Sequence, residues 1–139
     1  MLVQKNGQIF ELPDPDPVPV VYTAQNVNQE RDRRLQQDFT FNGNQFQRDT
    51  VSLSRITGAA TLAGFAVAGG AQEGNLRWAN ANQDFGWIAS DNSVVPMDAQ
   101  TCFAFGQAAA AVETAIVFAA KSLRELDPIP DPATWAGWP

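Results

Sequence analysis

Apolar residues recur at helical spacing in three stretches of this chain, and polar segments separate them. A residue that can cap a helix N-terminus stands at or just before the start of each stretch: Thr23, Asp49 and Asp98. The spacing predicts helices over residues 25–37, 50–67 and 99–126. The second stretch is rich in glycine and alanine, so another helix can approach it closely, and it ends at Gly69-Gly70.

Two Asn-Gly pairs between apolar residues predict β-hairpins, because both residues tolerate the positive φ of a type I′ turn. One pair is Asn6-Gly7, with a strand on either side of it within residues 1–12. The other is Asn42-Gly43, which follows the apolar run at 39–41. Further short strands are predicted at residues 76–78, 84–89 and 94–95. The predicted fold is therefore α+β, with short antiparallel hairpins or a meander packed against two or three helices, and with extended Pro-rich arms at the N- and C-termini.

Alternating proline and aspartate residues mark both ends of the chain. Residues 13–19 predict an extended, polyproline-like spacer, since each proline fixes φ and removes an amide donor. Residues 127–139 repeat this composition and carry two tryptophans. We therefore divide the chain into an N-terminal hairpin and Pro-rich arm (1–22), a compact domain (23–126) and a C-terminal arm (127–139).

The composition is that of one globular domain without disulfides. Hydrophobic residues make up 45% of the 139 residues and charged residues 17%, which suits a chain with one core. A net charge of -6 disfavours nucleic acid and membrane surfaces as partners, and the basic cluster at 31–34 is interleaved with acids, as on a solvated helix face. The longest apolar stretch, Gly58 to Ala71, is too short to span a membrane, and no signal peptide is expected.

The side chains that most enzymes use are missing or lie in apolar surroundings. The chain has no histidine, which removes the usual general base, the common nucleophile systems and most transition-metal sites. Its one cysteine, Cys102, lies on the apolar stripe of the last predicted helix, where an inert buried thiol is expected rather than a reactive one. We expect neither an enzyme nor a cofactor.

Acidic and amide side chains in the second half of the chain allow two weaker interpretations. Asn80, Asn82, Asp84 and Asp91 loosely match a calcium loop, but its glycine and final glutamate are missing, so a polar turn is the preferred interpretation. A pair of acids for sugar hydrolysis could come from Glu73, Asp84 or Asp91, although nothing in the sequence sets their spacing. Roles in turns suffice for all of them.

The terminal arms carry the candidate partner-binding residues. Tryptophan is costly to leave in water and is a common anchor of protein interfaces, and the tail carries Trp135 and Trp138 as well as Ile129. The first hairpin carries Ile9 and Phe10 on a unit that is marginal in water without a partner surface. These five residues are expected to dock to another protein, in a groove or at a sheet edge. The alternative is that the tail folds back on its own domain or stays loose.

A series of motifs along residues 27–126 resembles a small uncharacterised domain of tailed bacteriophages and prophages. The motifs are Glu30-Arg-Asp-Arg-Arg-Leu35, Phe39-Thr-Phe-Asn-Gly43, Ile56-x-Gly-Ala-Ala60, the run from Trp87 to Asp98, and Phe105-Gly-Gln-Ala-Ala109. That domain occurs in tail-fibre-associated and tail-tip-region proteins. The resemblance implies a virion or tail-assembly role and brings no catalytic residue with it. The two arms lie outside it.

These observations lead to one hypothesis and two alternatives. The chain is expected to be a structural protein of the phage tail, made in the host cytoplasm and held in the virion, where its arms bind fibre, tail-tip or baseplate proteins. Several copies are expected around a symmetric tail, since closed rings repeat one interface. The first alternative is a tail-fibre assembly chaperone that is absent from the mature particle. The second is an enzyme that acts on host surface glycan through Asp84 and Asp91.

Overall fold

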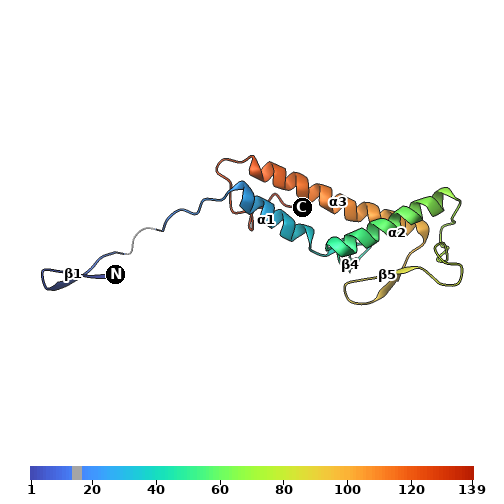
Figure 1. Ribbon diagram of the computed structural model, residues 1–139, viewed down its shortest axis with the longest axis horizontal. Helices are drawn as coiled ribbons and strands as arrows, with labels where there is room; N and C mark the ends of the chain where they lie inside the picture. The colour runs from blue at the N-terminus through green and yellow to red at the C-terminus, as the bar shows by residue number, and fades with distance from the viewer. Residues whose placement is uncertain (14–16) are drawn as a thin grey trace.

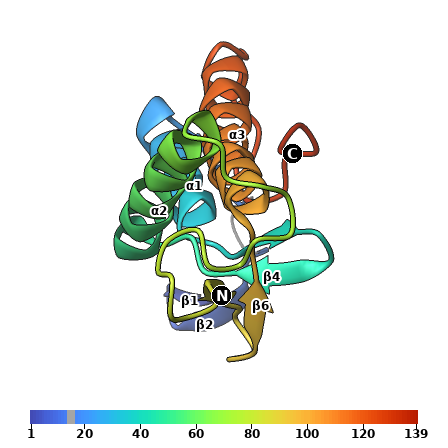
Figure 2. The same ribbon diagram turned by 90° about the vertical axis from the view of Figure 1, so that its right-hand side faces the viewer.

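The computed structural model describes residues 1–13 and 17–139. Within these residues the chain forms three helices and three two-stranded antiparallel hairpins, so the predicted α+β class is confirmed. The hairpins are separate sheets and do not join into a continuous meander. Figures 1 and 2 show the helices in one layer, with the two later hairpins packed beneath them.

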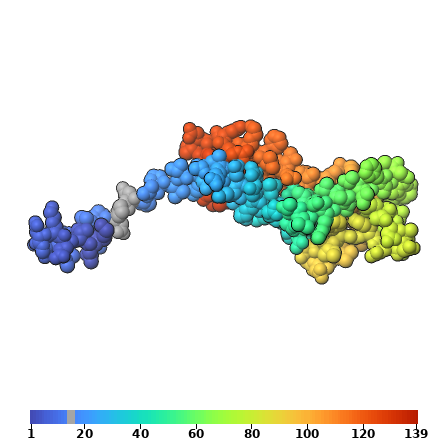
Figure 3. All heavy atoms as spheres, viewed as in Figure 1, coloured from blue at the N-terminus to red at the C-terminus, as the bar shows by residue number. Residues whose placement is uncertain are grey.

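The first hairpin forms as predicted and lies apart from the helices (Figures 1 and 3). Strand β1 (Leu2–Lys5) pairs with β2 (Gln8–Glu11), and Asn6 and Gly7 connect them with φ values of 55° and 78°. Positive φ at both positions is the mark of a type I′ turn. Residues 17–22, which lead into the first helix, are extended, and residues 14–16 of the predicted polyproline spacer lie outside the described residues.

Helix α1 (Ala24–Leu35) and the hairpin after it follow the prediction closely. Thr23 and Asn26 form a capping box, in which each side chain accepts the backbone amide of the other. Strand β3 (Phe39–Phe41) pairs with β4 (Asn44–Phe46), and the φ values of 49° and 81° at Asn42-Gly43 again belong to a type I′ turn. The helix ends at residue 35 rather than at the predicted residue 37.

Two long helices that run in opposite directions form the centre of the domain (Figure 1). Asp49 caps α2 (Thr50–Ala68) and Asp98 caps α3 (Ala99–Arg124), each by accepting the amide of the third residue after it. Small residues let the two backbones approach, because a Cβ added to Gly106 would lie 2.2 Å from the Cβ of Ala60. Helix α2 packs along the first half of α3, and α1 packs along the second half.

The third hairpin pairs β5 (Gly86–Ile88) with β6 (Val94–Pro96), where strands are predicted. The strand predicted at residues 76–78 is wrong, because the chain there forms turns. The side-chain oxygens of Asn75 and Asn80 each accept the amide two residues on, which favours turns over a strand ladder. The segment is anchored instead by the indole N–H of Trp78, which donates to the carbonyl of Met97 at 3.0 Å.

The main core lies between α2, α3 and the two later hairpins. Its centre is Phe105 of α3, whose ring contacts four aromatic rings of the hairpins: Phe39, Phe41, Phe46 and Trp87. Cys102 and Ala109 lie about one turn away on the same face of α3 and are buried with it. The apolar stripe of the last helix is therefore the surface that holds the hairpins.

A buried arginine joins three elements beside this core. Arg48 is 1% exposed, and its guanidinium donates to the carbonyl of Leu35 at 2.8 Å and to that of Ala109 at 3.0 Å. Burial lowers the pKa of Arg48, and the charge of Glu113, 3.7 Å away, opposes that effect. Since Leu35 is the last residue of α1, this donor satisfies a carbonyl at the helix end and fixes α1 against α3.

Helices α2 and α3 are apolar on their outer faces as well as on their inner faces. By length and composition alone both helices could cross a membrane. Only 17% of the apolar window of α2 and 22% of that of α3 is buried within the domain. Leu62 and Phe65 of α2 and Phe118 of α3 are among the large apolar side chains that remain exposed. Much of the apolar surface of these two helices therefore faces outward.

Candidate partner-binding surfaces

The five residues predicted to bind a partner lie on two surfaces with different surroundings. Ile9 and Phe10 of β2 are 71% and 45% exposed. Ile129, Trp135 and Trp138 of the tail pack against the domain. The structure thus brings the three tail residues together. The hairpin that carries the other two lies apart from the tail (Figure 1).

The N-terminal hairpin presents apolar side chains and two edge strands. Ile9 and Phe10 are consecutive on β2, so they point to opposite faces of the ribbon. Backbone bonds in both directions between Met1 and Leu12, at 3.0 and 3.1 Å, close its open end. An isolated two-stranded unit is marginal in water, and this hairpin lies apart from the helices of its own chain. It exposes one apolar side chain on each face, and its strand edges have the geometry for pairing with another strand.

The tail folds back on the domain, which is the alternative stated above for this segment. Ile129, Trp135 and Trp138 pack on a small buried cluster formed by Val27, Ala120 and Leu123. The two indole rings meet edge to face, with centroids 5.6 Å apart. A Cβ on Gly137 would lie 2.2 Å from the ring of Trp135, so this turn requires glycine. Partner binding by these three residues stays a prediction, and a partner would meet them only at their exposed edges or after the tail had moved.

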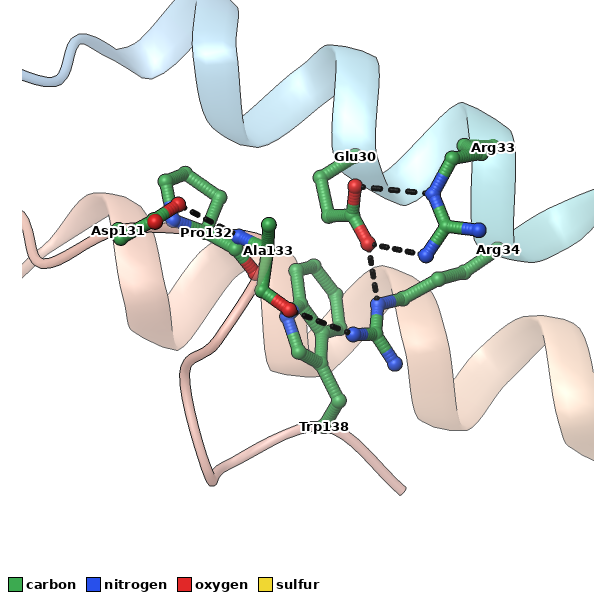
Figure 4. Close-up of polar contacts among 7 residues, drawn as sticks. All are labelled: Glu30, Arg33, Arg34, Asp131, Pro132, Ala133 and Trp138. Carbon is green, nitrogen blue, oxygen red and sulfur yellow. Dashed lines mark hydrogen bonds and ion pairs between the residues drawn. The ribbon is translucent and has the colours of Figure 1, made fainter.

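Arg34 connects the tail to α1 (Figure 4). Its guanidinium carbon lies 4.9 Å from the ring centroid of Trp138, and its Nη2 donates to the carbonyl of Ala133 at 3.4 Å. Glu30 holds this guanidinium in place, accepting from Arg34 at 2.8 Å and from Arg33 at 2.7 and 3.0 Å. The hydrogen bond from Arg33 is the main cause that lowers the pKa of Glu30. The basic cluster predicted as a solvated face therefore includes one residue that binds the tail.

Two hydrogen bonds within the tail set its shape, and Asp131 joins it to Tyr22. The indole N–H of Trp138 donates to the carbonyl of Pro132 at 2.8 Å. Asp131 accepts a hydrogen bond from the amide of Ala133 at 2.9 Å. It also faces Tyr22, and the pKa of Tyr22 is raised first by burial and then by the charge and hydrogen bond of Asp131. A groove of about 480 Å³ lies where residues 19–22 run beside residues 126–129. The tail therefore lies beside the segment that leads to the hairpin.

Two of the three acids considered for catalysis, Asp84 and Asp91, make local contacts. Asp84 pairs with Arg77 at 3.1 Å, and Asp91 accepts the amide and hydroxyl of Ser93 at 3.0 and 2.6 Å. Across residues 1–13 and 17–139, no three Cys, Asp or Glu side chains are grouped where they could hold a metal ion. Cys102 is buried, and burial raises the pKa of its thiol to about 11, so little reactive thiolate exists at neutral pH.

Sequence reasoning missed the contact between Arg34 and Trp138. Glu30 and Arg34 are four residues apart, which is the spacing of an ion pair on a helix, and this signal was present in the sequence. The position of Trp138 over Arg34 has no such local signal, because it depends on how residues 127–137 turn back.

The compact domain matches a known family. A family model described as Domain of unknown function (DUF4376) matches residues 22–134. The matched range extends past residue 126, where the resemblance above ended, and so includes most of the folded-back tail. No curated protein and no solved structure matches the chain.

Proposed function

The chain belongs to the DUF4376 family, a domain of unknown function that covers most of its length, and we propose that it is a structural component of a tailed-phage virion. In this proposal the domain is a rigid body of the tail, tail fibre or tail tip, and its terminal arms attach it to neighbouring tail proteins. The motifs that resemble a phage tail domain support the virion role. The exposed N-terminal hairpin is the observation that carries the attachment.

The hairpin supports attachment because it offers apolar side chains and strand edges away from the helices of its own chain (Figure 3). Ile9 and Phe10 are exposed, and so are Val18, Val20 and Val21 of the following segment. An isolated hairpin orders its backbone at an entropic cost and buries little apolar surface in return. A neighbouring sheet edge or groove would cover these side chains and pair the strand edges at the same time.

The C-terminal tail has a different part in the proposal. Trp135 and Trp138 pack on the cluster formed by α1 and α3, so the tail shapes the surface beside the segment that leads to the hairpin. A neighbour that binds the hairpin can also contact the outer side of this tail. The hairpin therefore supplies the main anchors, and the tail supplies a preformed adjoining surface.

Incorporation into particles tests the proposal. The phage or prophage that encodes the chain is grown with the wild-type gene or with Ile9→Glu, and purified particles are analysed by quantitative mass spectrometry. We expect the wild-type protein in a fixed ratio to the major tail proteins and a large loss of the variant from particles. Ile88→Glu is the matched control, because it adds the same charge at a 61% exposed isoleucine on β5 and should be incorporated normally.

Other outcomes would identify other functions. A tail-fibre chaperone would be abundant in infected cells and missing from purified particles. An enzyme acting on surface glycan would leave particle composition normal but lose infectivity when Asp84 and Asp91 are changed to asparagine. Equal incorporation of the wild type and Ile9→Glu would refute attachment through the hairpin.

A further inference from the structure

A groove of about 460 Å³ lies between the start of α2 and strand β5. Residues 86–90 line one side of it, and Gln47, Ser52 and Arg55 line the other. Side chains of a strand alternate between its two faces, so a groove lined by consecutive strand residues runs along the backbone edge of that strand. The groove therefore gives access to the main chain of β5.

The edge of β5 that faces away from β6 is unpaired. Ala89 donates its amide to Ser93 at 2.8 Å at the end of this ladder. Bonded and non-bonded pairs alternate along an antiparallel ladder, so Gly86 and Ile88 point their N–H and C=O groups away from β6. In the part of the chain that the structure describes, β5 and β6 form a sheet of two strands, and no backbone hydrogen bond from another element reaches these groups.

Arg55 gives the groove its charge and has no partner of its own. In the described part of the chain its guanidinium forms no ion pair and no hydrogen bond. The chain has 15 acidic and 9 basic residues, so this cation is unpaired although acids are in excess. The acids beside the groove in sequence bind elsewhere: Asp49 accepts the amide of Ser52, and Asp91 accepts that of Ser93. A free guanidinium favours a carboxylate as its ligand, because it can donate two parallel hydrogen bonds to it.

We propose that this groove binds an extended acidic peptide segment of another protein, which adds as a third strand to the free edge of β5. The outward groups of Gly86 and Ile88 are two residues apart, about 6.7 Å, and an extended peptide repeats its own hydrogen-bonding groups at that distance. An aspartate or glutamate on the face of the added strand that is turned toward α2 pairs with Arg55. The site is separate from the terminal arms, and attachment through them does not depend on it.

An acidic sugar is the other ligand that Arg55 could bind, and two observations favour the peptide. A sugar has no regular row of amides and carbonyls to match the edge of β5. It would stack on an open aromatic ring, whereas the ring of Trp87 packs against Phe85 and Phe105, at centroid distances of 6.3 and 5.7 Å. The free strand edge is thus the main recognition element, and Arg55 adds the preference for acid.

NMR titration of the full isotope-labelled chain tests the inference with a defined peptide, acetyl-Thr-Val-Asp-Val-Thr-amide. Saturable shifts are expected at the amides of Gly86 and Ile88. The same peptide with lysine in place of aspartate should bind at least about tenfold more weakly, because it loses a charge-assisted hydrogen bond. A version N-methylated at each internal residue should not bind, because it cannot donate to the edge of β5.

A charge reversal in the protein tests the role of Arg55. Arg55→Glu should reverse the preference, so that the lysine peptide binds more tightly than the aspartate peptide. Lys5→Glu is the matched control, because it makes the same change of charge on β1 and should keep the wild-type preference. Circular dichroism establishes that both variants are folded.

Several outcomes would overturn the inference. One is the absence of shifts at β5 with the aspartate peptide at millimolar concentration. Equal binding of the aspartate and lysine peptides would remove the role of Arg55, and equal binding of the N-methylated peptide would remove strand addition. Sodium glucuronate that shifts the same amides as strongly as the peptide would assign the groove to acidic sugars. Shifts at these amides that change with the concentration of the protein alone would assign the edge of β5 to a second copy of the chain.

Discussion

Gly106→Ala is expected to destabilise the domain, although alanine is the better helix former. The new Cβ would lie 2.2 Å from the Cβ of Ala60, whereas ordinary contact between such atoms is 3.4–4 Å. Helices α2 and α3 would have to separate by roughly 1 Å, which disturbs the packing along their whole contact. The change gains about 1 kcal/mol in helix propensity, and overpacking costs about 1–3 kcal/mol. Because this contact is so short, we take the upper figure and expect a net loss of about 2 kcal/mol.

A double-mutant cycle with Ala60→Gly isolates this contact. The single change Ala60→Gly removes the opposing methyl group and costs about 1 kcal/mol in helix propensity. In the double variant the two propensity effects cancel and the clash is gone, so stability should return to within about 1 kcal/mol of the wild type. Urea unfolding followed by circular dichroism measures all four free energies. Additive effects, or a Gly106→Ala variant more stable than the wild type, would refute the close packing of α2 on α3.

Two further predictions concern the tail and a helix cap. Trp138→Ala should lower the free energy of unfolding by about 1–3 kcal/mol. It removes a half-buried indole, the hydrogen bond of its N–H and the contact with Arg34. An unchanged urea midpoint would show that the tail does not hold this position in solution. Hydrogen bonds from the amide of Gly74 and then from Thr101 lower the pKa of Asp98 below its ordinary value of 3.8. The ionised carboxylate therefore contributes its full stabilisation above pH 3.8, and this stabilisation is lost as the pH falls through the lowered pKa. Thermal melts from neutral to strongly acidic pH should show a smaller loss for Asp98→Asn than for the wild type, and identical pH profiles would contradict this role.

Much of the fold could be predicted because it depends on neighbouring residues. The Asn-Gly turns require positive φ at two adjacent positions, and few other residue pairs tolerate that conformation. The caps at Thr23, Asp49 and Asp98 need only a short polar side chain three residues before an amide that it can bind. These signals place both ends of a segment within one or two residues, which is why the helices and the first two hairpins match their predictions.

The remaining features depend on residues that are far apart in the chain. Arg48 is a lone basic residue in the sequence, and its burial follows from a carbonyl of Ala109, 61 residues away. The prolines of the tail predicted an extended arm, but the cluster beneath Trp135 and Trp138 comes from α1 and α3. The error at residues 76–78 is different, since Trp78 fits a strand by type but uses its indole to anchor a turn. For Arg48 and the tail, contacts between distant residues decide the structure, whereas at residues 76–78 the local turns at Asn75 and Asn80 also override the strand pattern.

Helix α3 spans both hydrophobic clusters, and this sets how the domain would respond to mechanical load. At 26 residues it is about 39 Å long, with the aromatic core around its first half and the tail contact around its second half. A pulling force between the hairpin layer and the tail is transmitted along the axis of α3, which keeps its length under this load. The tail end, with its smaller cluster, would yield first and the aromatic end later, which gives the domain two separate rupture events under tension.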